Sequence, residues 1–150
     1  MKNAFSSGKN LINCNGNLLD LSVPRVMGIL NVTPDSFYDG GRYFQEKAVL
    51  ERVHQMVSEG ADIIDVGGYS SRPCAEHISG EEERKRILPV LDLIRKHHPD
   101  QILSVDTFRS DIARKVVKDF RVDVINDISA GEMDPDMFET MGDLQVPYIM

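Results

Sequence analysis

The sequence of 150 residues has no tryptophan and only two cysteines, Cys14 and Cys74. Two cysteines cannot form the disulfide framework on which small secreted domains depend. Basic residues are also in the minority, since 17 Lys and Arg stand against 24 Asp and Glu, which gives a formal net charge of −7 at pH 7. A protein that binds nucleic acid without sequence preference needs a basic face for the phosphates, so the composition argues against that class.

Long apolar runs are missing as well. No stretch approaches the roughly 20 residues that a membrane-spanning helix needs, and the first ten residues, MKNAFSSGKN, lack the apolar core of a signal peptide. Hydrophobic residues make up 41% of the chain and charged residues 27%, which is typical of a folded globular domain. We therefore expect a globular protein of the cytoplasm with two reduced thiols.

Two kinds of segment follow one another along the chain. Residues 1–24 contain Asn15-Gly16, a two-residue turn signal with apolar flanks, which predicts an N-terminal β-hairpin. After Pro24, short apolar runs alternate with helical stretches. The predicted strands are residues 26–32, 62–67, 102–106 and 124–128, with a fifth beginning at 146–150. The first run is almost continuously apolar, which predicts a strand buried on both faces.

Local signals predict where the intervening helices begin and end. Gly60 is a plausible C-terminal cap of the first helix, and residues 79–82 have the spacing of a capping box that opens the second. Pro89 lies inside that second helix, where it should introduce a kink or a break. The predicted N-caps of the two later helices are Ser110 and Asp134, the latter followed by Pro135 in the first turn.

Strands that alternate with helices predict a parallel sheet with right-handed crossovers. Two architectures remain, a doubly wound open sheet or part of an eight-stranded barrel. The first strand runs into Asn31-Val32-Thr33-Pro34 instead of a glycine fingerprint, which disfavours the doubly wound sheet. A complete (β/α)8 TIM barrel takes about 250 residues, and about four and a half units are present. We therefore expect residues 25–150 to be the N-terminal half of such a barrel in a larger protein.

Polar residues close each of the first four predicted strands: Asn31, then Gly67-Gly68, then Asp106, then Asn126-Asp127. In such folds the carboxyl ends of the strands meet at one rim, where ligands bind. A carboxylate accepts two N–H bonds side by side and an amide offers one donor and one acceptor, so Asp106 and Asn126 suit a flat heterocycle with an amide-like edge. Asn31 and the oxygen-rich residues 33–36 suit magnesium or a phosphate group.

Four ordered segments resemble dihydropteroate synthase. Residues 27–37, MGILNVTPDSF, followed by DGG at 39–41, resemble the first signature of that family, and IIDVGG at 63–68 with SSRP at 70–73 resembles the second. SVDT at 104–107 and INDI at 125–128 match two further stretches in the family's order and spacing. The resemblance covers about residues 25–150.

The resemblance implies a (β/α)8 barrel of folate biosynthesis. Such a transferase condenses 6-hydroxymethyl-7,8-dihydropterin diphosphate with 4-aminobenzoate to give 7,8-dihydropteroate and diphosphate, and the family tends to form homodimers. Asn31 would contact Mg²⁺, the implied cofactor, and the diphosphate. Asp106 and Asn126 would hydrogen-bond the pterin ring, and Ser71 would replace a threonine that contacts the pterin substrate.

Two loops would frame the aminobenzoate pocket. The first would contribute Asp35, Ser36 and Phe37, and the second Arg72 and Pro73. The implied catalytic residues are Asn31, Asp35 and Arg72.

The sequence departs from the family pattern in the second signature, where Tyr69 replaces a common glutamate, Ser71 a threonine and Cys74 a glycine. The family's later cationic segments have no counterpart up to Met150, so we expect little activity from these 150 residues alone. One rival interpretation is the pterin domain of a methyltetrahydrofolate-dependent methyltransferase, against which the loop after Asn31 argues. Another is a non-catalytic truncated barrel that serves as a binding or assembly module.

Overall fold

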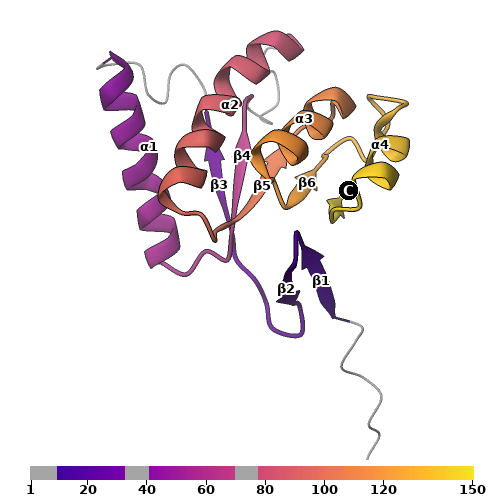
Figure 1. Cartoon of the computed structure of the whole chain (residues 1–150), viewed down its shortest axis with the longest axis horizontal. Coiled ribbons are helices and arrows are strands. Elements are labelled where there is room, and N and C mark those ends of the chain that lie inside the picture. The colour runs from indigo at the N-terminus through magenta and orange to yellow at the C-terminus, as the bar shows by residue number, and fades with distance from the viewer. Residues whose placement is uncertain (1–9, 33–40, 70–77) are drawn as a thin grey trace, which may run out of the picture.

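The computed structural model of the chain describes residues 10–32, 41–69 and 78–150 (Figure 1). Two short antiparallel strands come first and are followed by alternating strands and helices. The elements are β1 Leu11–Cys14, β2 Asn17–Asp20, β3 Met27–Asn31, α1 Gly41–Ser58, β4 Ile63–Gly67, α2 Gly80–His97, β5 Ile102–Asp106, α3 Ser110–Phe120, β6 Val124–Asn126, α4 Met137–Leu144 and β7 Tyr148–Ile149. The predicted hairpin and all five predicted strands are confirmed, with boundaries moved by at most two residues.

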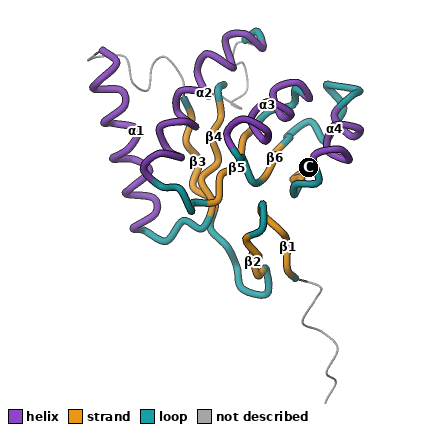
Figure 2. The backbone as a smooth tube through the Cα atoms, viewed as in Figure 1, coloured by secondary structure: helices purple, strands orange, loops and turns teal. Residues whose placement is uncertain are grey.

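Strands β3 to β7 form one sheet in chain order, and each pairs in parallel with the next. Helices α1 to α4 follow one another across one face of this sheet (Figures 1 and 2). This arrangement is the expected portion of a (β/α)8 barrel, in which helices cover the outside and the other sheet face looks inward. Among the described residues no helix is both long and apolar enough to cross a membrane.

The main core lies between the sheet and the helices. Alternate strand residues point to this outer face, because side chains in a strand have a period of two. They pack against the apolar stripes of the helices in one buried cluster, which includes Leu30, Ile64, Val66, Leu103, Val105 and Ile125 from the strands and Val53, Ile87, Leu91, Ile112, Val116 and Met137 from the helices. Burying each such side chain contributes about 1.5–3 kcal/mol, so this layer fixes the sheet.

The hairpin covers the amino ends of the strands on the inner face. Cys14 and Leu19 are buried against Ile63 and Val124 in a second, smaller cluster. Higher on the same face Ile29 of β3 remains 63% exposed, so the prediction that the first strand is buried on both faces is wrong. The reason is its position, because β3 is an edge strand of the described sheet and its inner face has no neighbour on one side.

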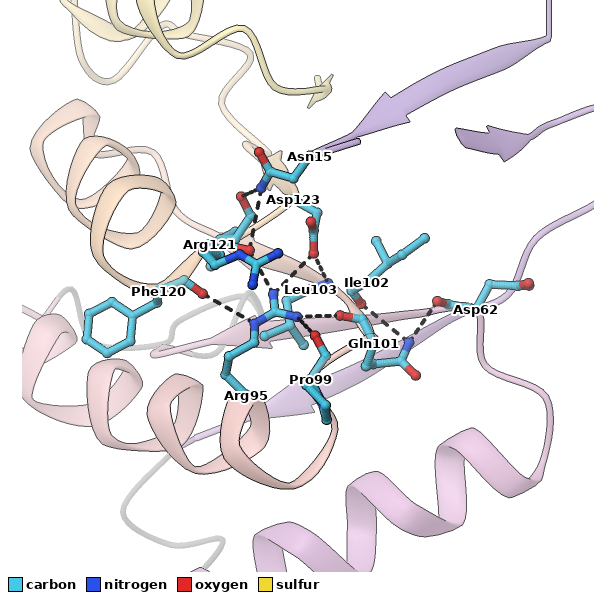
Figure 3. Close-up of polar contacts among 11 residues, drawn as sticks. Asn15, Asp62, Arg95, Pro99, Gln101, Ile102, Leu103, Phe120, Arg121 and Asp123 are labelled. Carbon is cyan, nitrogen blue, oxygen red and sulfur yellow. Dashed lines mark hydrogen bonds and ion pairs between the residues drawn. The ribbon is translucent and has the colours of Figure 1, made fainter. Parts of the chain in front are cut away.

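An arginine ties the amino ends of the strands together (Figure 3). The guanidinium of Arg95, from the last turn of α2, donates hydrogen bonds to the carbonyl oxygens of Pro99, Gln101 and Arg121 and to the carboxylate of Asp123. Asp123 is 4% exposed and also accepts from the backbone N–H of Leu103 at 2.9 Å. The charge of Asp123 is therefore paired and hydrogen-bonded, as a buried charge requires.

Helix starts follow the sequence signals in part. Ser79 caps α2, since its hydroxyl oxygen accepts from the N–H of Glu82 at 3.2 Å. Pro89 does not divide α2, which runs unbroken from Gly80 to His97. Of the two predicted outcomes the break is wrong, because packing of the helix against the sheet on both sides of the proline outweighs one lost backbone bond. The kink stays a prediction.

The predicted caps of α3 and α4 are wrong. Ser110 is the first helical residue of α3, after an N-cap at Arg109 that makes no side-chain cap bond. The N–H of Ser110 donates to Oδ2 of Asp134 at 2.7 Å, while Oδ1 of Asp134 accepts from the N–H of Asp136 at 3.0 Å, so Asp134 serves the start of α3 as well as the turn that leads into α4. The N-cap of α4 is Asp136.

Candidate functional site

The carboxyl ends of β3 to β6 form a row of polar positions. Asn31 is the register partner of Gly67, Gly67 that of Asp106, and Asp106 that of Asn126. Four positions that lie far apart in the sequence are therefore neighbours along one edge of the sheet. The prediction that Asn31, Asp106 and Asn126 share one rim is confirmed.

Gly67 leaves room between the polar side chains on either side of it. A Cβ atom at this position would lie 3.2 Å from Oδ1 of Asn31 and 3.6 Å from Oδ2 of Asp106. Both oxygens thus border the space above the glycine, and any larger residue would occupy that space. A ligand atom can therefore approach the amide oxygen and the carboxylate together.

Asp106 is electrostatically unusual. Burial, together with the negative charges of Asp65, Glu83 and Asp127, raises the pKa of Asp106 to about 7. Its Oδ1 atom is buried and has no hydrogen-bond partner in the part of the chain that the structure describes. Because an unpartnered carboxyl oxygen is costly to bury, this atom is suited to accept a hydrogen bond from a ligand.

Asn126 is held from below by a residue that the sequence analysis did not single out. Its Nδ2 donates to Oδ2 of Asp65 at 3.1 Å, across strand β5. Asp65 is 3% exposed, and burial raises the pKa of its carboxyl group. The available signal was a charged residue in the apolar run Ile63–Gly67, two positions before the rim and therefore on the same face as Gly67.

A second missed acid is Glu83, in the first turn of α2. It is fully buried, burial raises its pKa, and it forms an ion pair with Arg109. Arg109 also donates to the carbonyl oxygen of Ile78 at 2.6 Å. This pair therefore ties the start of α2 to the segment between β5 and α3, beside the rim.

Tyr69, one of the departures from the family pattern, packs next to that ion pair. Its ring meets the ring of Phe108 edge to face, with centroids 5.7 Å apart, and the guanidinium of Arg109 lies 4.3 Å above the Phe108 ring. Burial and the nearby acids raise the pKa of Tyr69, so its hydroxyl stays neutral. An aromatic residue here adds apolar cover beside Asp106.

Asp127 lies at the end of β6 but has a structural role. Its carboxylate accepts from the N–H groups of Ser129 and Gly131 at 2.8 and 2.9 Å and from the hydroxyl of Tyr148 at 2.6 Å. These bonds build the turn after β6 and join it to β7. Asp127 therefore contributes negative charge near Asp106, while its own oxygens are engaged.

The other predicted site residues lie outside the described residues. These are Asp35, Ser36 and Phe37 in the first loop and Ser71, Arg72 and Pro73 in the second. Their roles stay predictions.

The residues at the rim fit magnesium in one specific way. Within the described ranges no three His, Cys, Asp or Glu side chains are grouped as a metal site. Asn31 has an exposed side chain with a hard amide oxygen at the rim. Magnesium commonly keeps several waters and binds through few protein atoms together with phosphate oxygens, so Asn31 could hold it only jointly with a phosphorylated ligand.

Comparison with known proteins agrees with this geometry. The family described as "Pterin binding enzyme" matches residues 27–150. The chain is 47% identical over 126 residues to the "Folate synthesis bifunctional protein, mitochondrial" of Arabidopsis thaliana, covering 83% of this chain and 23% of that protein. It is 42% identical over 125 residues to the "Dihydropteroate synthase" of Streptococcus pyogenes serotype M1, covering 83% of this chain and 46% of that protein.

Solved structures give the same picture. Dihydropteroate synthase from Xanthomonas albilineans with 4-aminobenzoic acid superposes with a TM-score of 0.83 at 40% identity, covering 93% of this chain and 50% of that one. The same enzyme in complex with 7,8-dihydropteroate gives a TM-score of 0.78 at 38% identity, covering 92% and 49%. The chain thus spans half or less of the length of these relatives, and its sheet and helices are part of a TIM barrel. It belongs to the pterin-binding enzyme family, together with the dihydropteroate synthases.

Proposed function

We propose that the protein carrying this chain is a dihydropteroate synthase, and that this chain contributes the pterin side of its active site. The observation that carries the proposal is the pairing of Asp106 and Asn126 at neighbouring strand ends, with a buried carboxyl oxygen that has no partner among the described residues. Relatives with that name share 32–42% of the aligned residues.

Asp106 and Asn126 bind the edge of the pterin ring in this proposal. The ring carries N–H groups that donate to the carboxylate of Asp106, and such donors favour the ionised form of a group whose pKa is about 7. During the reaction the bond between the pterin methylene carbon and the diphosphate oxygen breaks, and the electron pair leaves with the diphosphate. The positive charge that develops on the ring is stabilised by the nearby carboxylate.

The amine of 4-aminobenzoate then forms the new carbon–nitrogen bond and releases a proton to solvent. Asp35 and Arg72 are the residues proposed to orient the aminobenzoate, together with Ser36, Phe37 and Pro73. Ser71 is proposed to contact the pterin substrate through its hydroxyl group. Closed loops over these groups would keep water from reacting with the cation.

Asn31 is proposed to hold the Mg²⁺-bound diphosphate at the same rim. Bound Mg²⁺ supplies positive charge that neutralises the leaving diphosphate. The side chain of Asn31 contributes one neutral oxygen, and the space above Gly67 lets a phosphate oxygen come close to it.

The test is product formation from defined substrates. The whole protein that carries this chain is incubated with 6-hydroxymethyl-7,8-dihydropterin diphosphate, 4-aminobenzoate and MgCl₂. Diphosphate and dihydropteroate are then quantified. Diphosphate release that depends on aminobenzoate and is lost in Asp106→Asn supports the proposal, while Asp123→Asn, at the opposite ends of the strands, should retain it. Pterin binding without turnover would instead support a non-catalytic pterin-binding module, and methyl transfer from methyltetrahydrofolate would support the methyltransferase.

A cytoplasmic location and a homodimeric assembly are further proposals, which come from the sequence and the family resemblance. Cell fractionation tests the first. Sedimentation of the purified protein, with and without a pterin ligand, tests the second.

A further inference from the structure

The hydrogen bond between Asp65 and Asn126 has a fixed direction. Oδ2 of Asp65 lies 3.1 Å from Nδ2 of Asn126. The NH₂ group of the amide faces the Asp65 oxygen, which accepts its hydrogen bond. This bond favours the ionised form of Asp65 and opposes the effect of burial on its pKa, and an ionised carboxylate has no proton to donate to an amide oxygen. The carbonyl oxygen of Asn126 is thereby left on the other side of the amide group. One acid thus selects one of the two possible amide orientations.

The bond also spans an intervening strand of the sheet. Asn126 lies on β6 and Asp65 on β4, and β5 runs between them. The register partner of Asp65 on β5 is Ser104, a small residue, so the Asn126 side chain can reach over that strand. Asp65 is two residues before Gly67 and therefore one layer beneath the rim. Asp65 is thus placed to support a rim residue from below.

We infer that Asp65 is a positioning residue that orients the Asn126 amide, so that Asn126 offers an acceptor oxygen to the ligand beside the carboxylate of Asp106. The inference rests on the proposed function for the identity of that ligand. Asn126 and Asp106 are register partners, so the rim offers two acceptors next to one another. The recognised ring edge must then carry adjacent N–H donors, and a ring with a carbonyl oxygen in place of one donor should be rejected.

The first part of the experiment examines the amide without any ligand. The side-chain amide signals of Asn126 in ¹⁵N-labelled protein are assigned by their loss in Asn126→Asp. In Asp65→Asn both groups are amides, and each can donate or accept. We therefore expect the Asn126 signals to shift and their hydrogen exchange to become faster. Asp123→Asn is the matched control, because Asp123 is also a buried aspartate (4% against 3% exposed) but lies at the opposite ends of the strands.

The second part measures selectivity by fluorescence titration with two probes, 6-hydroxymethylpterin and 6-hydroxymethyllumazine. The lumazine carries a carbonyl oxygen where the pterin carries its amino group. The wild-type chain should prefer the pterin by tenfold or more, as expected for one hydrogen bond to a charged or oriented group. Asp65→Asn should reduce this ratio to about twofold, because a free amide can rotate to serve either ring. A merely destabilised site would lose affinity for both probes equally.

A double variant in which the two residues are exchanged tests whether the preference for the pterin can be restored. In Asp65→Asn/Asn126→Asp the amide lies below and the carboxylate at the rim, so an acceptor oxygen again faces the ligand and the preference for the pterin should return. An unchanged probe ratio in Asp65→Asn, or no recovery in the exchanged pair, overturns the inference. If the wild-type chain binds neither probe, the proposed pterin site fails while the amide signals still decide the role of Asp65: signals that do not change in Asp65→Asn overturn it.

Discussion

Replacing Asp106 by asparagine should stabilise the protein, and the gain should depend on pH. The substitution keeps the size of the side chain and removes its ability to ionise. Burial and three neighbouring acids raise the pKa of Asp106 to about 7 in the folded protein, whereas an unfolded chain gives an aspartate about 3.9. The folded state therefore binds this proton more tightly than the unfolded state does.

The sign of the pH effect follows from that difference. Neutral Asp106 contributes its full stabilisation below about pH 4, and this stabilisation is lost as the pH rises through about 7. A difference of about three pKa units corresponds to at most about 4 kcal/mol at 1.36 kcal/mol per unit. Because the side chain is only half-buried, solvent screens part of this effect, and we expect about 1–2 kcal/mol.

Urea unfolding followed by far-UV circular dichroism, between about pH 4 and pH 8, measures the effect. The quantity of interest is the free energy of unfolding of Asp106→Asn minus that of the wild type at each pH. We expect this difference to be small at about pH 4, where much of the unfolded chain also carries the proton, to grow as the pH rises between the two pKa values, and to reach its full value at about pH 8. Subtracting the wild type removes the titration of groups that the substitution does not influence.

Asp62→Asn provides a control with the opposite sign. The N–H of Val26 donates to the carboxylate of Asp62 at 2.9 Å, and this bond holds the pKa of Asp62 below its ordinary value. Its contribution is present above about pH 4 and is lost only in acid, so Asp62→Asn should be less stable than the wild type throughout the range. A difference for Asp106→Asn that does not vary with pH, or that grows toward acid, would refute the reasoning.

Three other substitutions test different parts of the molecule. Arg95→Ala leaves the buried carboxylate of Asp123 without its ion pair and should lower the free energy of unfolding by about 3 kcal/mol with unchanged pterin affinity; a loss below 1 kcal/mol in urea titration would contradict this role. Gly67→Ala places a methyl group 3.2 Å from Oδ1 of Asn31 and should weaken pterin binding at least tenfold, while the unfolding midpoint changes little. Equal affinity of the variant and the wild type in a fluorescence titration would show that the ligand does not use this space. Asp134→Ala removes the acceptor of the first N–H of α3 and should cost about 1 kcal/mol, whereas Pro135→Ala serves as the neighbouring control with no such bond.

The strands and the rim could be predicted because both depend on local pattern. Apolar runs of five to seven residues specify strands that are covered by helices, and parallel pairing brings their carboxyl ends to one edge. Asn31, Asp106 and Asn126 are each the last residue of a correctly predicted strand. Their convergence then needed no knowledge of individual contacts.

The errors come from contacts between distant residues. Asp134 has the local features of a cap for α4 and one of its oxygens accepts from the N–H of Asp136, yet its other oxygen accepts from the N–H of Ser110, 24 positions earlier. Asp65 lies 61 positions before Asn126 and on a strand that is not its neighbour. A capping rule or a strand pattern considers only nearby residues, so neither could identify these partners. In α2, packing along the whole helix outweighed a local rule for proline.

The two ends of the sheet differ in how completely their polar groups are satisfied. At the amino ends, the buried carboxylate of Asp123 has both an ion pair and a backbone donor. Toward the carboxyl ends, buried oxygens without a hydrogen-bond partner in the described chain occur in Asp65, Glu83, Ser104 and Asp106. Each such atom costs about 1–3 kcal/mol, so the sheet is least stable where its strands meet the rim. A ligand whose N–H group bonds the Asp106 oxygen at the rim removes part of that cost, and the same atom that destabilises the free protein therefore favours binding. This opposition explains why substitutions at Asp106 should improve stability and impair binding together, whereas substitutions at Arg95 should affect stability alone.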